Sequence, residues 1–338
     1  MPRIPDELVD CIVYLYPTIE EAKRGATRQE PGFGGTGFLI SLPLEDDPQV
    51  SVNYVVTNSH VVGSPGESRV LRVNAVGGGS EIGPTNQEDW IHHPDGDDVA
   101  VAMIGLSPQH FNVRTLAWSS WAATTAQLDQ WRVGPGDDVI FIGRFRWQEG
   151  RGRNLPTTRT GTIARMPLGE GVSHPRGFNQ ESFLIEARSI SGYSGSPVFL
   201  FIPPFSWRGE LANQNLDSRF HLSLIGIDWG YLPDHVPVIE KDLETPVPEN
   251  TWVAQNSGIM MVVPVWRIDQ FLKEDERLKT QRRDTYTRWK AEQGQPAALN
   301  VAQPNTESEP TREGFFRDLR KIKKEPRARQ GAESAQRD

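Results

Sequence analysis

The chain of 338 residues has little of three things: cysteine, long apolar runs, and basic charge in its main part. Its single cysteine, Cys11, cannot form an internal disulfide, which is typical of proteins in a reducing compartment. No apolar run approaches the roughly 18 residues that a membrane-spanning helix needs. Residues 1–10 lack the basic start and apolar stretch of a secretory leader. We therefore expect a cytoplasmic protein without a transmembrane segment.

Basic residues are concentrated at the C-terminal end. Of the 36 basic and 44 acidic residues in the chain, residues 273–338 hold 16 and 12, which leaves 20 and 32 for the rest and a net charge of −12 there. A nucleic-acid-binding surface is normally basic, so we expect no nucleic-acid partner. The basic tail fits either a regulatory partner with an acidic surface or, as is more usual for such tails, simple solvation.

Glycine and proline are abundant, at 31 and 26 residues, and they separate short apolar runs. The runs are rich in β-branched residues and fall into two successive sets, at 11–16, 35–42, 52–57, 69–76 and 99–104, and then at 137–143, 159–166, 182–188, 197–202, 221–227 and 259–265. Because no helical pattern separates the strands within a set, two β-sandwiches or β-barrels are favoured over a parallel α/β sheet. The long, proline-rich, acidic stretch 231–256 is predicted to be a functional or mobile loop.

After Pro264 the pattern becomes helical, with apolar residues at helical spacing between charges up to about residue 293. Residues 294–310 have almost no large apolar side chains and are predicted to be a disordered linker. Residues 312–324 form a short basic amphipathic segment that would be stabilised by docking on another surface, either a partner or this protein's own acidic part. We expect residues beyond 275 to be dispensable for catalysis but to matter for partner choice.

Three separated segments carry candidate chemistry: His60 in VVTNSHVV, Asp98 in GDDVAVAMI and Ser194 in ISGYSGSPVF. Each alone has an ordinary structural explanation, as a core histidine, a turn aspartate or a hairpin corner. Together they supply a serine nucleophile, an imidazole to remove its proton and an acid to orient the imidazole. An α/β-hydrolase would place the serine first and would need glycine where Ser196 stands, so that class is excluded.

These segments resemble the trypsin-like (chymotrypsin-fold) serine proteases, most closely their HtrA-like bacterial branch. Seven pieces follow the family's order, and they cover roughly residues 10–275: GTGFLIS, TNSHVV, DVAVAMI, VGPGDDVIFIG, EARSISGYSGSPV, LIGIDWG and GIMMVVPVWRIDQFL. The resemblance implies an all-β fold of two six-stranded antiparallel β-barrels with a C-terminal helix and a partly disordered tail. The barrels would span residues 1–120 and 121–275, and the charged tail residues 276–338.

Carried over residue by residue, the resemblance makes His60 the general base, Asp98 its orienting acid and Ser194 the nucleophile. The backbone N–H groups of Gly192 and Ser194 would form the oxyanion hole. Asp98 is favoured over Asp97 because the family's Asp-x-Ala frame matches Asp98, and because alternating side chains on a strand would turn Asp97 away from the imidazole.

The resemblance also implies where a peptide substrate would bind. Trp229 and Gly230, in IDWGY, match the strand that pairs with substrate backbone. Arg188 lies six residues before Ser194, where the family has the floor of its specificity pocket. If the Arg188 side chain faced into this pocket, it would favour an acidic residue before the scissile bond. The alternative is that this side chain faces solvent.

The resemblance calls for no cofactor and no metal, and His92 and His93 lack zinc-type spacing to other ligands. Tyr193 stands where zymogen-type trypsins have aspartate, so we expect no maturation by N-terminal cleavage. We also expect no PDZ domain. Two alternatives to a freely active endopeptidase stay open: a catalytically quiet protease fold used as a binding module, and a protease held inactive until a partner or signal releases it.

Overall fold

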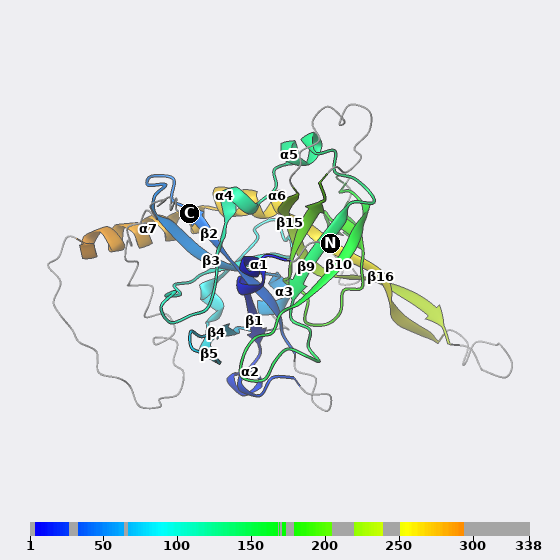
Figure 1. Ribbon diagram of the computed structural model, residues 1–338, viewed down its shortest axis with the longest axis horizontal. Helices are drawn as coiled ribbons and strands as arrows, with labels where there is room; N and C mark the ends of the chain where they lie inside the picture. The colour runs from blue at the N-terminus through cyan, green and yellow to red at the C-terminus, as the bar shows by residue number, and fades with distance from the viewer. Residues whose placement is uncertain are drawn as a thin grey trace, which may run out of the picture.

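The computed structural model describes residues 4–26, 33–63, 67–167, 169, 171–173, 179–204, 220–238 and 251–293. These residues form a mostly β structure (Figure 1). Its N-terminal part comprises α1 (Asp6–Asp10), β1 (Ile12–Tyr16), α2 (Ile19–Arg24), β2 (Gly35–Pro43), β3 (Ser51–Thr57), α3 (Ser59–Val62), β4 (Val70–Asn74), β5 (Ser80–Pro84), η1 (Gln87–Asp89), β6 (Trp90–His92), β7 (Ala100–Met103) and β8 (Leu116–Ala117).

The N-terminal strands form one eight-stranded sheet. Seven strands follow the order β5-β4-β1-β2-β3-β7-β6, and β8 pairs in parallel with β2 outside this path. Sequence analysis predicted a six-stranded barrel here. Apolar runs did not reveal β5, β6 and β8, because β6 and β8 have only three and two residues and β5, with the sequence SEIGP, holds a single large apolar side chain.

The C-terminal part closes on itself. Its elements are α4 (Trp118–Trp121), α5 (Thr125–Gln130), β9 (Asp138–Gly143), β10 (Thr157–Arg165), β11 (Val172–Ser173), β12 (Asn179–Gln180), β13 (Phe183–Glu186), β14 (Pro197–Ile202), β15 (His221–Pro237), β16 (Trp252–Pro264), α6 (Val265–Glu274) and α7 (Glu276–Gln293). Six of the strands make a closed barrel in the order β10-β13-β16-β15-β14-β9. This half therefore has the six-stranded barrel that the family resemblance implied.

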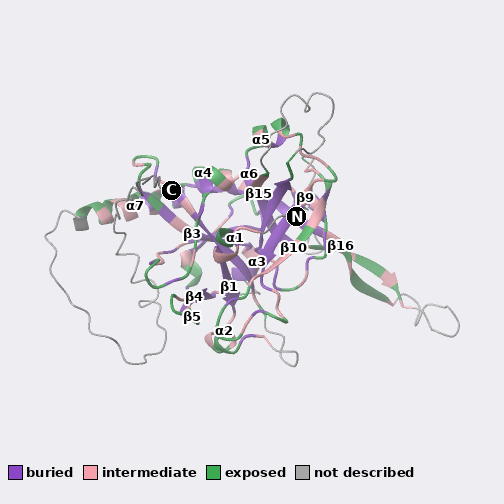
Figure 2. Ribbon diagram, viewed as in Figure 1, coloured by how far each residue is buried: buried purple, intermediate pink, exposed green. Residues whose placement is uncertain are grey.

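Strand β1 is buried along its whole length because the sheet is covered on both faces. Val13 and Leu15 belong to a core within the N-terminal sheet. Ile12 and Tyr14, on the opposite face, belong to a second core that continues into the barrel. The sheet and barrel thus share packed side chains, and the buried residues gather at the centre of the view in Figure 2.

Strands β15 and β16 extend beyond the barrel as a two-stranded hairpin (Figures 1 and 2). Their pairing continues outward from Pro233 opposite Asn256 to Pro237 opposite Trp252. The sequence prediction of a loop over 231–256 is therefore wrong for both ends of that stretch. Its prolines and polar residues suit an exposed two-stranded ribbon as well as they suit a loop, and Trp252 and Val253 are indeed exposed.

Helix α6 packs on the barrel through Val265, Ile268, Phe271 and Leu272, which are buried at helical spacing. Helix α7 follows directly and buries Leu278. No helix in the described ranges is both long enough and apolar enough to cross a membrane. The predicted linker 294–310 and amphipathic segment 312–324 lie outside the described residues.

Candidate active site

His60 lies on α3, a single helical turn that follows β3. Val61 and Val62 are buried in the N-terminal core, which leaves the side chain of His60 partly exposed, at 22%. Two neighbouring side chains fix this turn against the chain before β7. Asn58 Nδ2 donates to the carbonyl of Asp98 at 2.8 Å, and Ser59 Oγ donates to the carbonyl of Val99 at 2.8 Å.

Asp98 contacts His60 twice. Its Oδ2 lies 2.6 Å from His60 Nδ1, and its Oδ1 accepts the backbone N–H of His60 at 2.9 Å. The Asp98 side chain is 5% exposed, so water competes little for these bonds. A carboxylate on Nδ1 keeps the proton there and leaves the Nε2 lone pair free. This is the arrangement that a histidine general base needs.

Asp97 has different partners. Its Oδ2 accepts Arg267 Nε from α6 at 2.5 Å and lies 3.4 Å from His93 Nε2. Burial lowers the pKa of His93, and the negative charge of Asp97 acts in the opposite direction and raises it. The two adjacent aspartates therefore face different parts of the molecule: Asp98 contacts the imidazole of His60, and Asp97 contacts Arg267 on α6.

Gln180, on β12, is a residue of this site that sequence analysis missed. It is fully buried, its Oε1 accepts the N–H of Asp98 at 2.8 Å, and its Nε2 donates to Asp97 Oδ1 at 3.2 Å. The side chain of Gln180 thus bonds to the backbone of Asp98 and to the carboxylate of Asp97, and holds both residues in place. No sequence signal marks it, because its partners lie more than 80 residues away.

Ser194 lies on a tight turn before β14. The turn is closed by Tyr193 N–H to Ile190 O at 3.0 Å and by Ser196 N–H to Tyr193 O at 2.8 Å. Gly192 and Gly195 have φ of +103° and +90°, a region that favours glycine. A Cβ on Gly195 would lie 1.9 Å from Thr36 O, so this position requires glycine on grounds of space as well.

The start of β2 brings the Ser194 turn against α3. The N–H of Thr36 donates to Ser194 O at 2.8 Å. A Cβ placed on Gly35 would lie 2.8 Å both from Ser194 O and from a methyl group of Val61, the residue after His60. The structure therefore brings the segments of all three predicted triad residues together where the N-terminal sheet meets the barrel. Ser194, like His60, is partly exposed.

Two of the predicted substrate-binding residues, Trp229 and Gly230, lie on β15, and the third, Arg188, lies on the segment that leads to the Ser194 turn. Trp229 on β15 is buried, and its Nε1 donates to Ser182 Oγ at 3.0 Å. Gly230 follows with a φ of +147°. Arg188 has an exposed side chain, and its carbonyl accepts Arg159 Nη1 at 2.7 Å.

Asp228, also on β15, is a second residue that sequence analysis missed. It is fully buried; its Oδ2 accepts Ser189 Oγ at 2.7 Å and its Oδ1 accepts the N–H of Gly230 at 2.9 Å. Its backbone carbonyl accepts the N–H of Gly195 at 2.8 Å, next to Ser194. Burial raises the pKa of Asp228 to about 7. The sequence did offer one signal for Asp228, because it is the only charged residue in the otherwise apolar run LIGIDWG.

No group of three or more histidine, cysteine, aspartate and glutamate side chains that could hold a metal ion occurs among the residues described. His92 and His93 have protein partners instead. His92 Nδ1 lies 3.0 Å from Ser59 Oγ, and the ring of His93 packs on Phe271 with centroids 5.0 Å apart.

The site thus places a histidine held by a buried aspartate near a glycine-flanked serine. Residues 35–200 match the family model of the trypsin-like peptidase domain. This trypsin-like peptidase region begins with β2, ends within β14 and contains His60, Asp98 and Ser194. It supports a place for the chain among the trypsin-like proteases. A search of curated proteins found no match.

Proposed function

We propose that this protein is a serine endopeptidase in which Ser194 is the nucleophile, His60 the general base and Asp98 the orienting acid. The observation that carries the proposal is the double contact of Asp98 with His60, at 2.6 Å to the ring and 2.9 Å to the backbone, beside the Ser194 turn. The match to the trypsin-like peptidase domain supports it independently.

The reaction would proceed in two halves through an acyl-enzyme. Ser194 Oγ attacks the scissile carbonyl carbon while His60 Nε2 takes the hydroxyl proton, and the tetrahedral oxygen is stabilised by the N–H groups of Gly192 and Ser194. Collapse of this intermediate breaks the C–N bond, and His60 returns the proton to the departing amine. Water then attacks the ester with His60 again as base, which releases the acid and restores Ser194.

Asp98 stabilises the imidazolium that forms in each half without itself taking the proton. Apart from the substrate peptide, every group in this scheme belongs to the protein or is water. The substrate backbone would lie along β15 at Trp229 and Gly230, as an added strand.

In this proposal the N-terminal sheet is the counterpart of the first chymotrypsin-like barrel and the closed barrel is the second, with units at residues 1–120 and 121–275. The protein would be an HtrA-like enzyme that acts on an intracellular protein. Its activity would be restrained by a partner or signal, and the tail 276–338 is the candidate contact.

A fluorophosphonate probe tests the proposal directly, because it modifies only a serine that is activated as a nucleophile. We expect the probe to label Ser194 in the full chain, as located by peptide mass spectrometry. Ser194→Ala and His60→Ala should each abolish labelling and reduce peptide hydrolysis on the order of 10⁴-fold.

Ser191→Ala is the matched control, because Ser191 is an exposed serine three residues away on the same segment. It should label and hydrolyse peptide like the unaltered protein. Hydrolysis that survives in Ser194→Ala would overturn the assignment of the nucleophile. A folded wild-type protein that neither labels nor hydrolyses any peptide would favour the binding-module alternative.

A further inference from the structure

The hydroxyl of Thr36 connects two backbone groups from distant parts of the barrel. Thr36 Oγ1 donates to the carbonyl of Gly192 at 2.7 Å and accepts the N–H of Arg144 at 2.9 Å. Thr36 is fully buried, so water cannot replace either bond. Only a hydroxyl can donate and accept through one small atom at this position, which restricts the role to threonine or serine.

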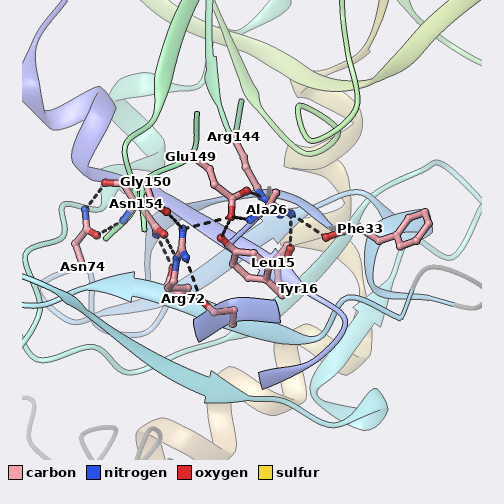
Figure 3. A network of polar contacts seen from close by, with 11 residues as sticks. Leu15, Tyr16, Ala26, Phe33, Arg72, Asn74, Arg144, Glu149, Gly150 and Asn154 are labelled. Carbon is pink, nitrogen blue, oxygen red and sulfur yellow. Dashed lines mark hydrogen bonds and ion pairs between the residues drawn. The ribbon is translucent and has the colours of Figure 1, made fainter. Parts of the chain in front are cut away.

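Arg144 is itself firmly held. Its side chain is fully buried and lies over the ring of Tyr16, with the guanidinium carbon 4.1 Å from the ring centroid. Its Nε donates to Glu149, and its Nη1 donates to the carbonyls of Leu15 at 3.2 Å and Phe33 at 3.0 Å (Figure 3). The N–H that Thr36 accepts therefore belongs to a residue anchored on the N-terminal sheet.

Gly192 packs closely against the same residue, since a Cβ on Gly192 would lie 2.7 Å from Arg144 O. The Gly192 carbonyl accepts the Thr36 hydroxyl, and the next carbonyl, that of Tyr193, accepts Ser196 N–H at 2.8 Å. In a trans peptide the N–H and C=O point in opposite directions. The Tyr193 carbonyl bond therefore turns the N–H of Ser194 away from Ser196, and the Thr36 bond fixes the peptide plane just before it.

We propose that Thr36 is a positioning residue that holds the Gly192–Tyr193 peptide in the orientation the oxyanion hole requires, with Arg144 as its anchor on the N-terminal sheet. The inference rests on the proposed function, because it assigns Gly192 and Ser194 as the oxyanion donors. It also explains how the turn is held with Tyr193 at the position before the nucleophile. The orientation is fixed by a hydroxyl already present in the folded chain, without an acid at that position.

Without the hydroxyl, the Gly192 carbonyl loses its buried partner, and only the bond from Tyr193 N–H to Ile190 O at 3.0 Å still holds this peptide. The N–H groups of Gly192 and Ser194, which belong to the peptides on either side of it, would then lose their fixed direction toward the substrate oxygen. Substrate binding along β15 does not depend on this peptide. The loss should therefore appear in kcat and in the binding of transition-state analogues, with KM nearly unchanged.

The test uses the full chain and four single-residue variants, compared in pairs. Thr36→Val removes the hydroxyl and keeps the shape, and Thr36→Ser keeps the hydroxyl. Thr36→Ala differs from Thr36→Ser only by the hydroxyl, so this pair gives the answer if Thr36→Val does not fold. Thr85→Val is the control, because the buried Thr85 Oγ1 also donates to a backbone carbonyl, that of Arg69 at 2.7 Å, away from the site.

We expect kcat for a small peptide to fall roughly 10–100-fold in Thr36→Val and Thr36→Ala, which is less than the loss of a whole oxyanion donor. The affinity for a peptide aldehyde, whose hemiacetal oxygen would occupy the oxyanion hole, should fall in parallel. Thr36→Ser and Thr85→Val should keep both properties within a few-fold of the unaltered protein.

Equal kcat in Thr36→Val and Thr85→Val, or in Thr36→Ala and Thr36→Ser, would overturn the proposal while leaving the triad assignment intact. A fall in kcat without a fall in aldehyde affinity would overturn it as well, because the defect would then lie outside the oxyanion hole. Failure of the proposed function is distinguishable, since the unaltered protein would then show neither activity nor labelling.

Discussion

Two adjacent aspartates in this chain have separate tasks, and their contacts make the separation measurable. Asp98 bonds to the ring and backbone of His60, whereas Asp97 bonds to Arg267 on α6 and lies beside His93. Both residues lie before β7, which begins at Ala100, so these contacts and not strand pairing separate the directions of their side chains.

The first prediction separates catalysis from stability at this pair. Asp98→Asn should lower turnover roughly 10³–10⁴-fold, because the amide cannot hold the proton on His60 Nδ1. Asp97→Asn should leave turnover nearly unchanged but lower the free energy of unfolding by about 1–2 kcal/mol, through the weakened bond to Arg267. Steady-state kinetics and urea denaturation measure the two effects. The reverse pattern would mean that Asp97 is the orienting acid.

Sequence analysis could predict His60, Asp98 and Ser194 because each lies in a short segment with its own local pattern. It could not predict Thr36, Gln180 or Asp228. Each of them bonds to a residue that lies between 39 and 156 residues away along the chain, and only the closed fold brings these pairs together. A buried polar side chain must find such partners, but the sequence does not say where they are.

At the scale of elements, β15 carries the feature that responds to pH. Asp228 sits where β15 passes the Ser194 turn, with two side-chain bonds and two backbone bonds to that region. Its pKa is raised from 3.8 to about 7 because burial disfavours the charged form, against the bonds from Ser189 and Gly230 and the charge of Arg159. The folded protein therefore keeps a proton here that the unfolded chain releases near pH 4.

The second prediction follows from the sign of this shift. Between about pH 4 and 7 the folded state binds one more proton at Asp228 than the unfolded state, so this residue makes the protein less stable as pH rises through that window. Asp228→Asn mimics the protonated acid, and Ser189 can accept from its amide. The variant should gain stability relative to the unaltered protein from pH 4 to 8, by at most about 4 kcal/mol. Urea denaturation across this range measures the difference, and a constant difference would contradict the prediction.

The strands of the barrel were predictable because apolar, β-branched runs end at glycine or proline. The hairpin formed by the outer parts of β15 and β16 was not, because its exposed strands bury little on either face and so show no alternation of apolar and polar residues. The open N-terminal sheet was missed for a related reason. Of its added strands, β6 and β8 are too short to give a periodic signal, and β5, with the sequence SEIGP, holds a single large apolar residue.

For the whole molecule, α7 marks how far the packed structure extends. Leu278 is fully buried, Arg277 Nη2 donates to the carbonyl of His92 at 2.9 Å, and Tyr286 Oη donates to Asp47 Oδ2 at 2.9 Å. These contacts join α7 to the N-terminal sheet, which lies far from it along the chain. The division that sequence analysis placed at residue 275 therefore falls inside packed structure.

The third prediction compares two truncations. A chain of residues 1–294 keeps α7 and should hydrolyse a small peptide about as well as the full chain. A chain of residues 1–275 exposes the surface that Leu278 covers, and should unfold at a lower urea concentration. If both truncated chains matched the full chain in stability, α7 would not be part of the folded unit.

The polar network drawn in Figure 3 also bears on how the molecule unfolds, because it joins the N-terminal sheet to the segment after β9. Arg72, on β4, is 1% exposed and bonds to Asn154 Oδ1 at 2.8 Å and Gly150 O at 3.1 Å, both from the segment after β9. Glu149, from that segment, accepts Tyr16 Oη at 2.8 Å. If either half melted alone, the other would be left with buried charges and no counterparts, at a cost of several kcal/mol. We therefore expect the sheet and the barrel to unfold together in a single transition, with the boundary near residue 120 dividing the topology but not the folding.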